Sequence, residues 1–162
     1  MRLALICTLL ASPACADGFA ITDLTKAPDM VPVLGAGFIS KVEADRVTLV
    51  CFECPGAPMI DILMGRQTDG TEDRIRSGET TMADMQSICQ AREPACKING
   101  LSVESAVGFV STYPVLGQNG STTVVMLGGD MLTIRSVSAD PAVASAHALT
   151  LQQNLIPAIT GQ

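Results

Sequence analysis

The sequence contains no tryptophan and few other aromatic residues. Four phenylalanines and one tyrosine make up 3% of its 162 residues. Sites for single-stranded nucleic acids stack bases on exposed aromatic rings, so this composition argues against a stacking platform. The core of the fold must be built from aliphatic side chains instead.

Basic residues are also in the minority. Ten lysines and arginines face sixteen aspartates and glutamates, and the formal net charge is −6. Proteins that bind nucleic acids or anionic membranes present a positive patch to the phosphates. The charge balance therefore argues against both kinds of partner.

Histidine occurs once, at position 147. The chain also lacks the G-x-S-x-G, H-E-x-x-H and phosphate-binding glycine motifs, which argues against the commonest hydrolase designs. No cofactor motif is present, and we expect no cofactor. A pair among the sixteen carboxylates could still perform acid–base chemistry, so the sequence leaves catalysis open while it favours a non-enzymatic protein.

The first sixteen residues have the pattern of a secretory signal peptide. Arg2 supplies the positive charge, residues 3–11 are apolar, and Ala-Cys-Ala at 14–16 matches the cleavage signal. A membrane-spanning helix needs about 20 apolar residues, and no such run follows. We expect cleavage after Ala16, a mature chain without a membrane span, and a location in a bacterial periplasm or outside the cell.

The mature chain divides into a leader and one domain. Residues 17–37 contain Pro28, Pro32 and a Gly-Ala-Gly segment, so we predict an irregular leader that packs loosely. Residues 38–162 contain no repeat and no linker, which predicts a single domain.

Alternation of apolar and polar residues predicts the strands. We expect a hairpin turn at Asp69-Gly70, which would bring residues 74–76 back onto the preceding strand, and a tight turn at residues 128–130. The predicted strands are residues 38–42, 46–52, 59–64, 103–113, 122–127 and 131–137.

Two helices complete the pattern. Thr80 or Thr81 caps a helix that ends near residue 91, and its apolar stripe predicts that it lies on a core. Asp140-Pro141 opens the last helix, on which His147 is expected to face solvent. The predicted apolar positions are Met82, Met85, Ile88 and Cys89 in the first helix and Ala144, Ala148, Leu149, Leu151, Leu155, Ile156 and Ile159 in the second.

These elements predict an α+β fold: a mainly antiparallel sheet with one short central helix and a C-terminal helix packed on one face. The segment V-V-M-L-G-G-D-M-L-T-I within residues 123–134, followed by the helix at 142–159, resembles the PsbP-like group of secreted α+β domains. The resemblance covers about the last 40 residues. It implies a hairpin followed by a helix on the sheet, and it transfers no functional residue.

Four cysteines remain once Cys7 and Cys15 leave with the signal peptide. We predict disulfides within this set, which lies in an oxidising compartment. Short loops favour the local pairs Cys51–Cys54 and Cys89–Cys96, whereas the predicted burial of Cys51 and Cys89 favours a bridge from strand to helix, and the alternatives stay open.

The C-x-x-C spacing also allows other chemistry. Redox dithiols normally start a helix, but Pro55 follows Cys54 directly. Zinc would need two closely spaced cysteine pairs, and the second pair here is widely spaced. Cu(I) bound by Cys51, Cys54 and Met59 is a further alternative to plain structural disulfides without metal.

An acidic loop contains Asp69, Glu72 and Asp73. It lacks the regular alternation of a calcium-binding loop, so we interpret it as a solvated turn.

The sequence as a whole predicts a secreted periplasmic protein, non-enzymatic and stabilised by two disulfides, with a binding or accessory role. An edge strand or the sheet face opposite the helices would contact a partner protein or a small ligand. The alternative is a periplasmic thiol-redox or copper-handling factor that uses Cys51 and Cys54.

Overall fold

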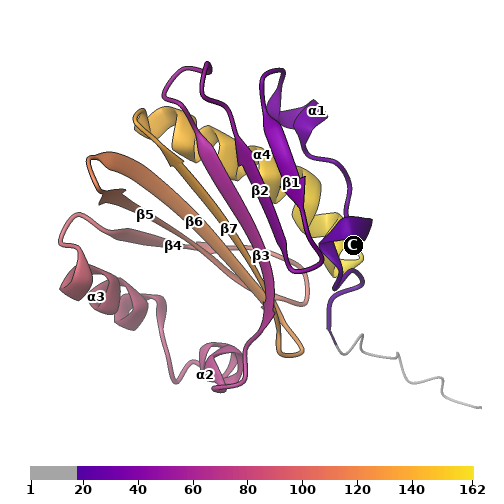
Figure 1. Ribbon diagram of the computed structural model, residues 1–162. Helices are drawn as coiled ribbons and strands as arrows, with labels where there is room; N and C mark the ends of the chain where they lie inside the picture. Colours follow the sequence, from indigo (N-terminus) through magenta and orange to yellow (C-terminus); the bar gives the residue numbers. More distant parts are fainter. Residues whose placement is uncertain (1–17) are drawn as a thin grey trace, which may run out of the picture.

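The computed structural model describes residues 18–162. The signal peptide predicted for residues 1–16 lies outside the described residues. One antiparallel sheet of seven strands dominates the structure, in the order β1-β2-β3-β7-β6-β5-β4 (Figure 1). The strands are β1 (Ile39–Val42), β2 (Arg46–Val50), β3 (Met59–Arg66), β4 (Lys97–Leu101), β5 (Val107–Val115), β6 (Gln118–Leu127) and β7 (Asp130–Ser138).

Helices lie on both sides of this sheet. The long C-terminal helix α4 covers one face, and α2 and α3 lie on the other side (Figure 1). The helices are η1 (Leu24–Lys26), α1 (Val31–Leu34), α2 (Thr71–Ser77), α3 (Met82–Arg92) and α4 (Pro141–Thr160). The predicted α+β class with a C-terminal helix on the sheet is confirmed. In residues 18–162, no helix combines the length and the apolar character that a membrane crossing requires.

Two tight hairpins set the register of the central strands. Gly128 and Gly129 join β6 to β7, and Leu116 and Gly117 join β5 to β6. All four residues have positive φ, as a two-residue hairpin turn requires. The turn predicted at residues 128–130 is therefore confirmed.

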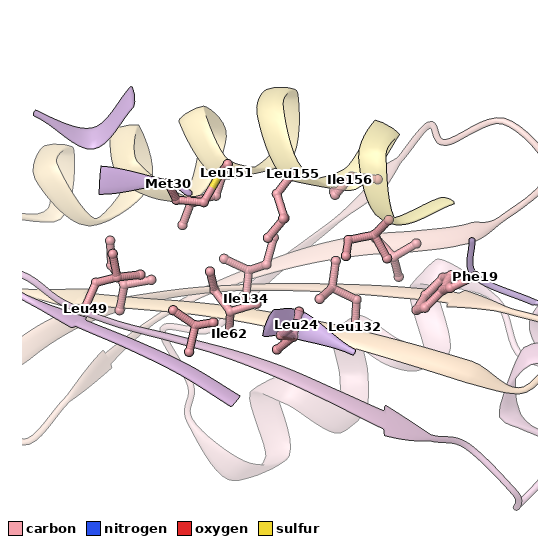
Figure 2. Packing of buried hydrophobic residues seen from close by; sticks show 14 of the residues in the cluster. Phe19, Leu24, Met30, Leu49, Ile62, Leu132, Ile134, Leu151, Leu155 and Ile156 are labelled. Atoms are coloured by element: carbon pink, nitrogen blue, oxygen red, sulfur yellow. The ribbon is translucent and has the colours of Figure 1, made fainter. Parts of the chain in front are cut away.

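The hydrophobic core lies between α4 and the sheet (Figure 2). Strand alternation directs Leu49, Ile62 and Ile134 toward the helix, and Leu151 and Leu155 meet them from α4. The stripe predicted for the C-terminal helix is buried at every position except Leu149, which is 51% exposed. Every labelled core side chain is aliphatic except that of Phe19, as the composition predicts.

The prediction of a loosely packed leader is wrong. Phe19, Leu24 and Met30 are buried in the same core, and the backbone N–H of Leu24 donates to the carbonyl of Ala44. The N–H of Phe19 donates to the buried carboxylate of Asp130 at 3.0 Å. Prolines and glycines lie around these apolar residues and interrupt the hydrophobic periodicity that would indicate a buried segment.

The hairpin predicted around Asp69-Gly70 is also wrong, because residues 71–77 form helix α2. The side chain of Asp69 accepts a hydrogen bond from the N–H of Thr71, which holds the entry of the chain into the helix. Acidic residues in the first turn and basic residues in the last turn complement the helix dipole. Gly78 ends the helix with a φ of 79°, the left-handed conformation that glycine adopts readily.

Strand β4 was not among the predicted strands. It contains Asn99-Gly100, a pair typical of turns, and it lies at the edge of the sheet beside β5 alone. Backbone pairing of β4 with β5 outweighs the preference of Asn99 and Gly100 for a turn.

Helix α3 begins where the sequence predicts but not against a core. Thr81 and Asp84 form a reciprocal capping box. However, no residue of α3 is buried, and Ile88 is 56% exposed. The apolar stripe of α3 faces a groove instead.

His147, which the sequence predicts to face solvent, is half-buried. Its ring packs edge-on against Phe38, with the ring centroids 5.3 Å apart. Burial lowers the pKa of the imidazole, because the charged form loses hydration there.

Candidate functional site

The four cysteines form the two local disulfides, Cys51–Cys54 and Cys89–Cys96. Their Cα atoms are 5.4 Å and 5.7 Å apart. The strand-to-helix bridge between Cys51 and Cys89 is not formed. The two bridges lie in different surroundings, one at the core and the other beside the groove.

The first disulfide is enclosed by neighbouring backbone. Cys51 is 2% exposed, and a Cβ atom added at Gly37 would lie 3.0 Å from its sulfur. Gly37 has a φ of 100°, so this close approach depends on glycine. The chain after Cys54 turns into β3 without forming a helix, so the helix N-terminus that activates redox dithiols is not present at this motif.

The copper alternative needs Met59 next to both cysteine sulfurs. Met59 pairs with Val50 across β2 and β3, so its side chain lies on the sheet face opposite that of Cys51. Both sulfurs are already bonded to each other. The structure therefore does not bring these three residues together as a ligand set, and residues 18–162 contain no cluster of three or more His, Cys, Asp or Glu arranged for a metal ion.

The acidic loop does not form one site either. Asp69 accepts a hydrogen bond from the N–H of Thr71 at the entry to α2, whereas Glu72 turns inward and is buried. The carboxylate of Glu72 accepts hydrogen bonds from the N–H groups of Gly128 at 3.2 Å and Gly129 at 2.9 Å, and from the guanidinium of Arg76 at 2.7 Å. The interpretation of this segment as a solvated turn is wrong for Glu72, which ties α2 to the β6–β7 hairpin.

Burial of Glu72 on its own would raise the pKa of its carboxyl group. The hydrogen bonds from Gly129, Arg76 and Gly128 outweigh that effect and hold the pKa below the ordinary value. The group is therefore charged at neutral pH and serves as an anchor between α2 and the sheet.

A groove of about 720 Å³ lies between α3 and the sheet face opposite α4. Met85 and Ile88 of α3 form one wall, and Ile98, Phe109 and Tyr113 of β4 and β5 form the other. Ligand sites in proteins are typically concave and mostly apolar and have volumes of about 300–1,000 Å³. The groove therefore has the size and surface of a small-molecule site.

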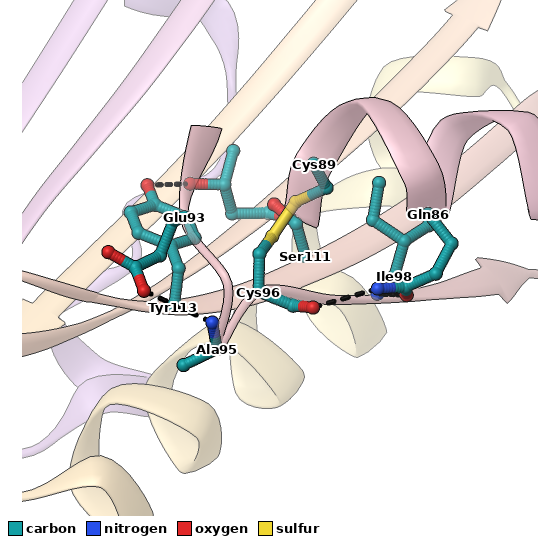
Figure 3. The surroundings of a disulfide bond; sticks show 9 residues. Gln86, Cys89, Glu93, Ala95, Cys96, Ile98, Ser111 and Tyr113 are labelled. Carbon is teal, nitrogen blue, oxygen red and sulfur yellow. Dashed lines mark hydrogen bonds between the residues drawn. A yellow bond between two sulfur atoms is a disulfide. The ribbon is translucent and has the colours of Figure 1, made fainter. Parts of the chain in front are cut away.

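The second disulfide fastens α3 over this groove (Figure 3). It joins Cys89 in the helix to Cys96, directly before β4. The amide group of Gln86 adds two hydrogen bonds, donating to the carbonyl of Cys96 at 2.8 Å and accepting from the N–H of Ile98 at 2.7 Å. The disulfide and the two hydrogen bonds of Gln86 thus tie α3, which has no fully buried residue, to β4.

Polar groups interrupt the sheet wall of the groove. Ser111 lines it, and the hydroxyl of Tyr113 lies 2.7 Å from that of Thr122 on β6. A Cβ atom at Gly120 would lie 2.8 Å from the Tyr113 ring, so glycine lets this ring approach β6. Phe109 and Tyr113 alternate along β5 and both line the groove, on the sheet face opposite the core.

Two arginines, Arg74 of α2 and Arg92 at the end of α3, also line the groove. The sequence did not single them out, because no motif surrounds them. The chain's single histidine, His147, lies on α4 across the sheet. The groove thus brings together apolar surface, hydroxyl groups and guanidinium groups, which suit binding.

A second crevice, of about 500 Å³, lies between the leader and the sheet. Its walls include Leu24, Met30, Leu49 and Leu155, which are buried core residues. We interpret it as a packing gap beneath the leader, and the groove under α3 is the stronger candidate site.

No protein-family model matches this chain, and no curated protein matches it.

Proposed function

We propose that this chain is a secreted, non-enzymatic binding or accessory protein of a bacterial periplasm, and that the groove under α3 is its binding site. The observation that carries the proposal is an apolar groove of about 720 Å³ whose outer wall is a helix with no core contacts of its own. A helix without a fully buried residue adds less to the stability of the fold than a core helix does, so we assign α3 a role in binding.

The proposal also includes export of the protein to an oxidising compartment, the bacterial periplasm. Disulfides persist in oxidising compartments and are rare in the cytosol, which supports secretion. The signal-peptide pattern with cleavage after Ala16 supports export as well.

The proposed relation to the PsbP-like group rests on the end of the chain. Strands β6 and β7 form a tight hairpin, and α4 follows it and packs on the sheet. This arrangement supports the resemblance at the level of fold, and the binding site is argued from the groove alone.

The substitution Ile88→Asp tests the site. Ile88 lines the groove and is half exposed, so aspartate should leave the fold intact and weaken binding of the neutral probe 1-octanol about tenfold, because a charge replaces apolar contact. Isothermal titration calorimetry of the purified mature protein measures the affinity. Leu149→Asp is the matched control, since Leu149 is equally exposed on α4, away from the groove. Equal affinities for both variants and the wild type would refute the groove as the site.

A further inference from the structure

The arginines divide into two groups by their partners. Residues 18–162 contain six arginines, and three of them form close pairs with buried carboxylates. These pairs are Arg46–Asp61 at 2.6 Å, Arg66–Asp130 at 2.9 Å and Arg76–Glu72 at 2.7 Å. In each pair the positive charge is matched within the fold.

The other three arginines have no carboxylate oxygen of residues 18–162 closer than 4.0 Å. Arg92 and Arg135 form no ion pair with any residue from 18 to 162, and the nearest carboxylate oxygen to Arg74 is that of Asp69 at 4.0 Å. The side chain of Arg74 donates to uncharged acceptors, the carbonyl of Asp69 and the hydroxyl of Thr71. Its charge is therefore poorly neutralised.

These three arginines gather on one side of the sheet. Arg74 and Arg92 line the groove. Arg135 pairs with Thr122, which pairs with the groove residue Ser111, so all three of these positions share the sheet face that carries the groove. The Nε atom of Arg135 is buried and has no hydrogen-bond partner. Asp61 lies opposite Arg135 on β3, but its carboxylate is paired with Arg46 at 2.6 Å. The groove side of the sheet therefore carries guanidinium groups without a close ion pair.

One carboxylate also lines the groove, that of Glu93. It accepts a hydrogen bond from the N–H of Ala95 at 3.1 Å and forms no ion pair with Arg92. Two guanidinium groups against one carboxylate leave the groove with a net positive charge.

We propose that the ligand of this groove is a small amphipathic carboxylate. This proposal rests on the proposed function, in which the groove is the binding site. The apolar body of the ligand contacts Ile88, Ile98 and Phe109, and its carboxylate binds the guanidinium groups of Arg74 and Arg92. Guanidinium and carboxylate groups match as planar, bidentate partners. The charge complementarity of the lining favours an acid over a neutral lipid of the same length.

The test compares octanoate with 1-octanol, which share an alkyl chain and differ in charge. Calorimetry with the mature protein should show one site that binds octanoate at least tenfold more tightly than octanol, because a hydrogen bond to a charged group is worth about 1.5–3 kcal/mol. The double variant Arg74→Gln/Arg92→Gln should lower octanoate affinity to that of octanol, so that the preference for the charged probe is lost. Arg92→Gln alone should remove part of it, and Arg92 is exposed and forms no ion pair within residues 18–162.

Lys41→Gln is the control, because Lys41 is an exposed cation on β1 whose partner is Glu43, away from the groove. It should leave both affinities unchanged. Equal binding of octanoate and octanol by the wild type, or an arginine variant that keeps the preference for octanoate, would overturn the carboxylate proposal while the groove remains the site. Failure of both probes to bind would overturn the carboxylate proposal and the proposed function together.

Discussion

Glu72→Ala should destabilise the protein by about 2–3 kcal/mol and lower the melting temperature by about 5–10 °C. The substitution removes the acceptor for the N–H groups of Gly128 and Gly129 and leaves the guanidinium of Arg76 without its partner. The link between α2 and the β6–β7 hairpin is lost with it. Thermal unfolding followed by circular dichroism measures the change.

Asp73→Ala provides the matched control, since Asp73 is the exposed neighbour of Glu72 in the same helical turn. Its effect should stay within about 0.5 kcal/mol. An equal loss for both substitutions would contradict the anchoring role of Glu72 and indicate a general effect of charge in α2.

The pH dependence of stability gives Glu72 a second signature. Its pKa is held below the ordinary value in the folded protein, so its stabilisation is complete above the unfolded pKa and is lost as the pH falls through the folded pKa. The difference in unfolding free energy between wild type and Glu72→Gln should therefore shrink in acid. A difference that stays constant from neutral to acidic pH would contradict this account.

The double substitution Cys89→Ser/Cys96→Ser should weaken 1-octanol binding about a hundredfold. Without the disulfide, α3 is held near β4 by the hydrogen bonds of Gln86 and by half-buried side chains alone. A helix that moves away from β4 removes the apolar wall that Met85 and Ile88 provide. The loss in stability should be about 2 kcal/mol, since the disulfide closes a short loop. Calorimetry measures the binding, and amide hydrogen exchange should show α3 unprotected over an intact sheet.

Cys51→Ser/Cys54→Ser removes the other disulfide and serves as the comparison. This bridge lies at the core end of β2 and contributes nothing to the lining of the groove. At temperatures where this variant is folded, its octanol affinity should equal that of the wild type. Equal losses in the two variants would show that binding follows general stability and not the position of α3.

The sequence predicts well the elements that carry their own local signals. Alternation along β2 and β3 places Leu49 and Ile62 on the core face, and Asp140-Pro141 marks the start of α4. The glycine pair at 128–129 specifies a tight hairpin. In each case the local preference and the tertiary structure agree.

Predictions failed where a distant contact decides the conformation. Asp69-Gly70 is typical of a hairpin turn, yet Asp69 caps a helix whose Glu72 binds residues more than fifty positions away. Phe19 belongs to the core because Asp130 holds its backbone. No pattern within a short window of sequence contains these partners.

The groove was beyond prediction for a related reason. Its walls come from α2, α3, β4 and β5, and the apolar stripe of α3 has the same period whether it faces a core or a ligand site. The structure shows that the stripe faces a groove and not the core, because α3 lies on the opposite side of the sheet from α4. Loop length favours the local disulfides while predicted burial favours a strand-to-helix bridge, and the structure contains the local pairs.

Amide chemical-shift mapping by NMR on addition of 1-octanol tests most directly whether the groove under α3 binds ligands. We predict saturable chemical-shift changes that are concentrated in residues 80–98 of α3 and β4 and in residues 109–113 of β5. The shifts of residues 24–30 and of the Cys51–Cys54 loop should stay unchanged. Shifts centred on the crevice beneath the leader, or spread over the molecule without saturation, would contradict it.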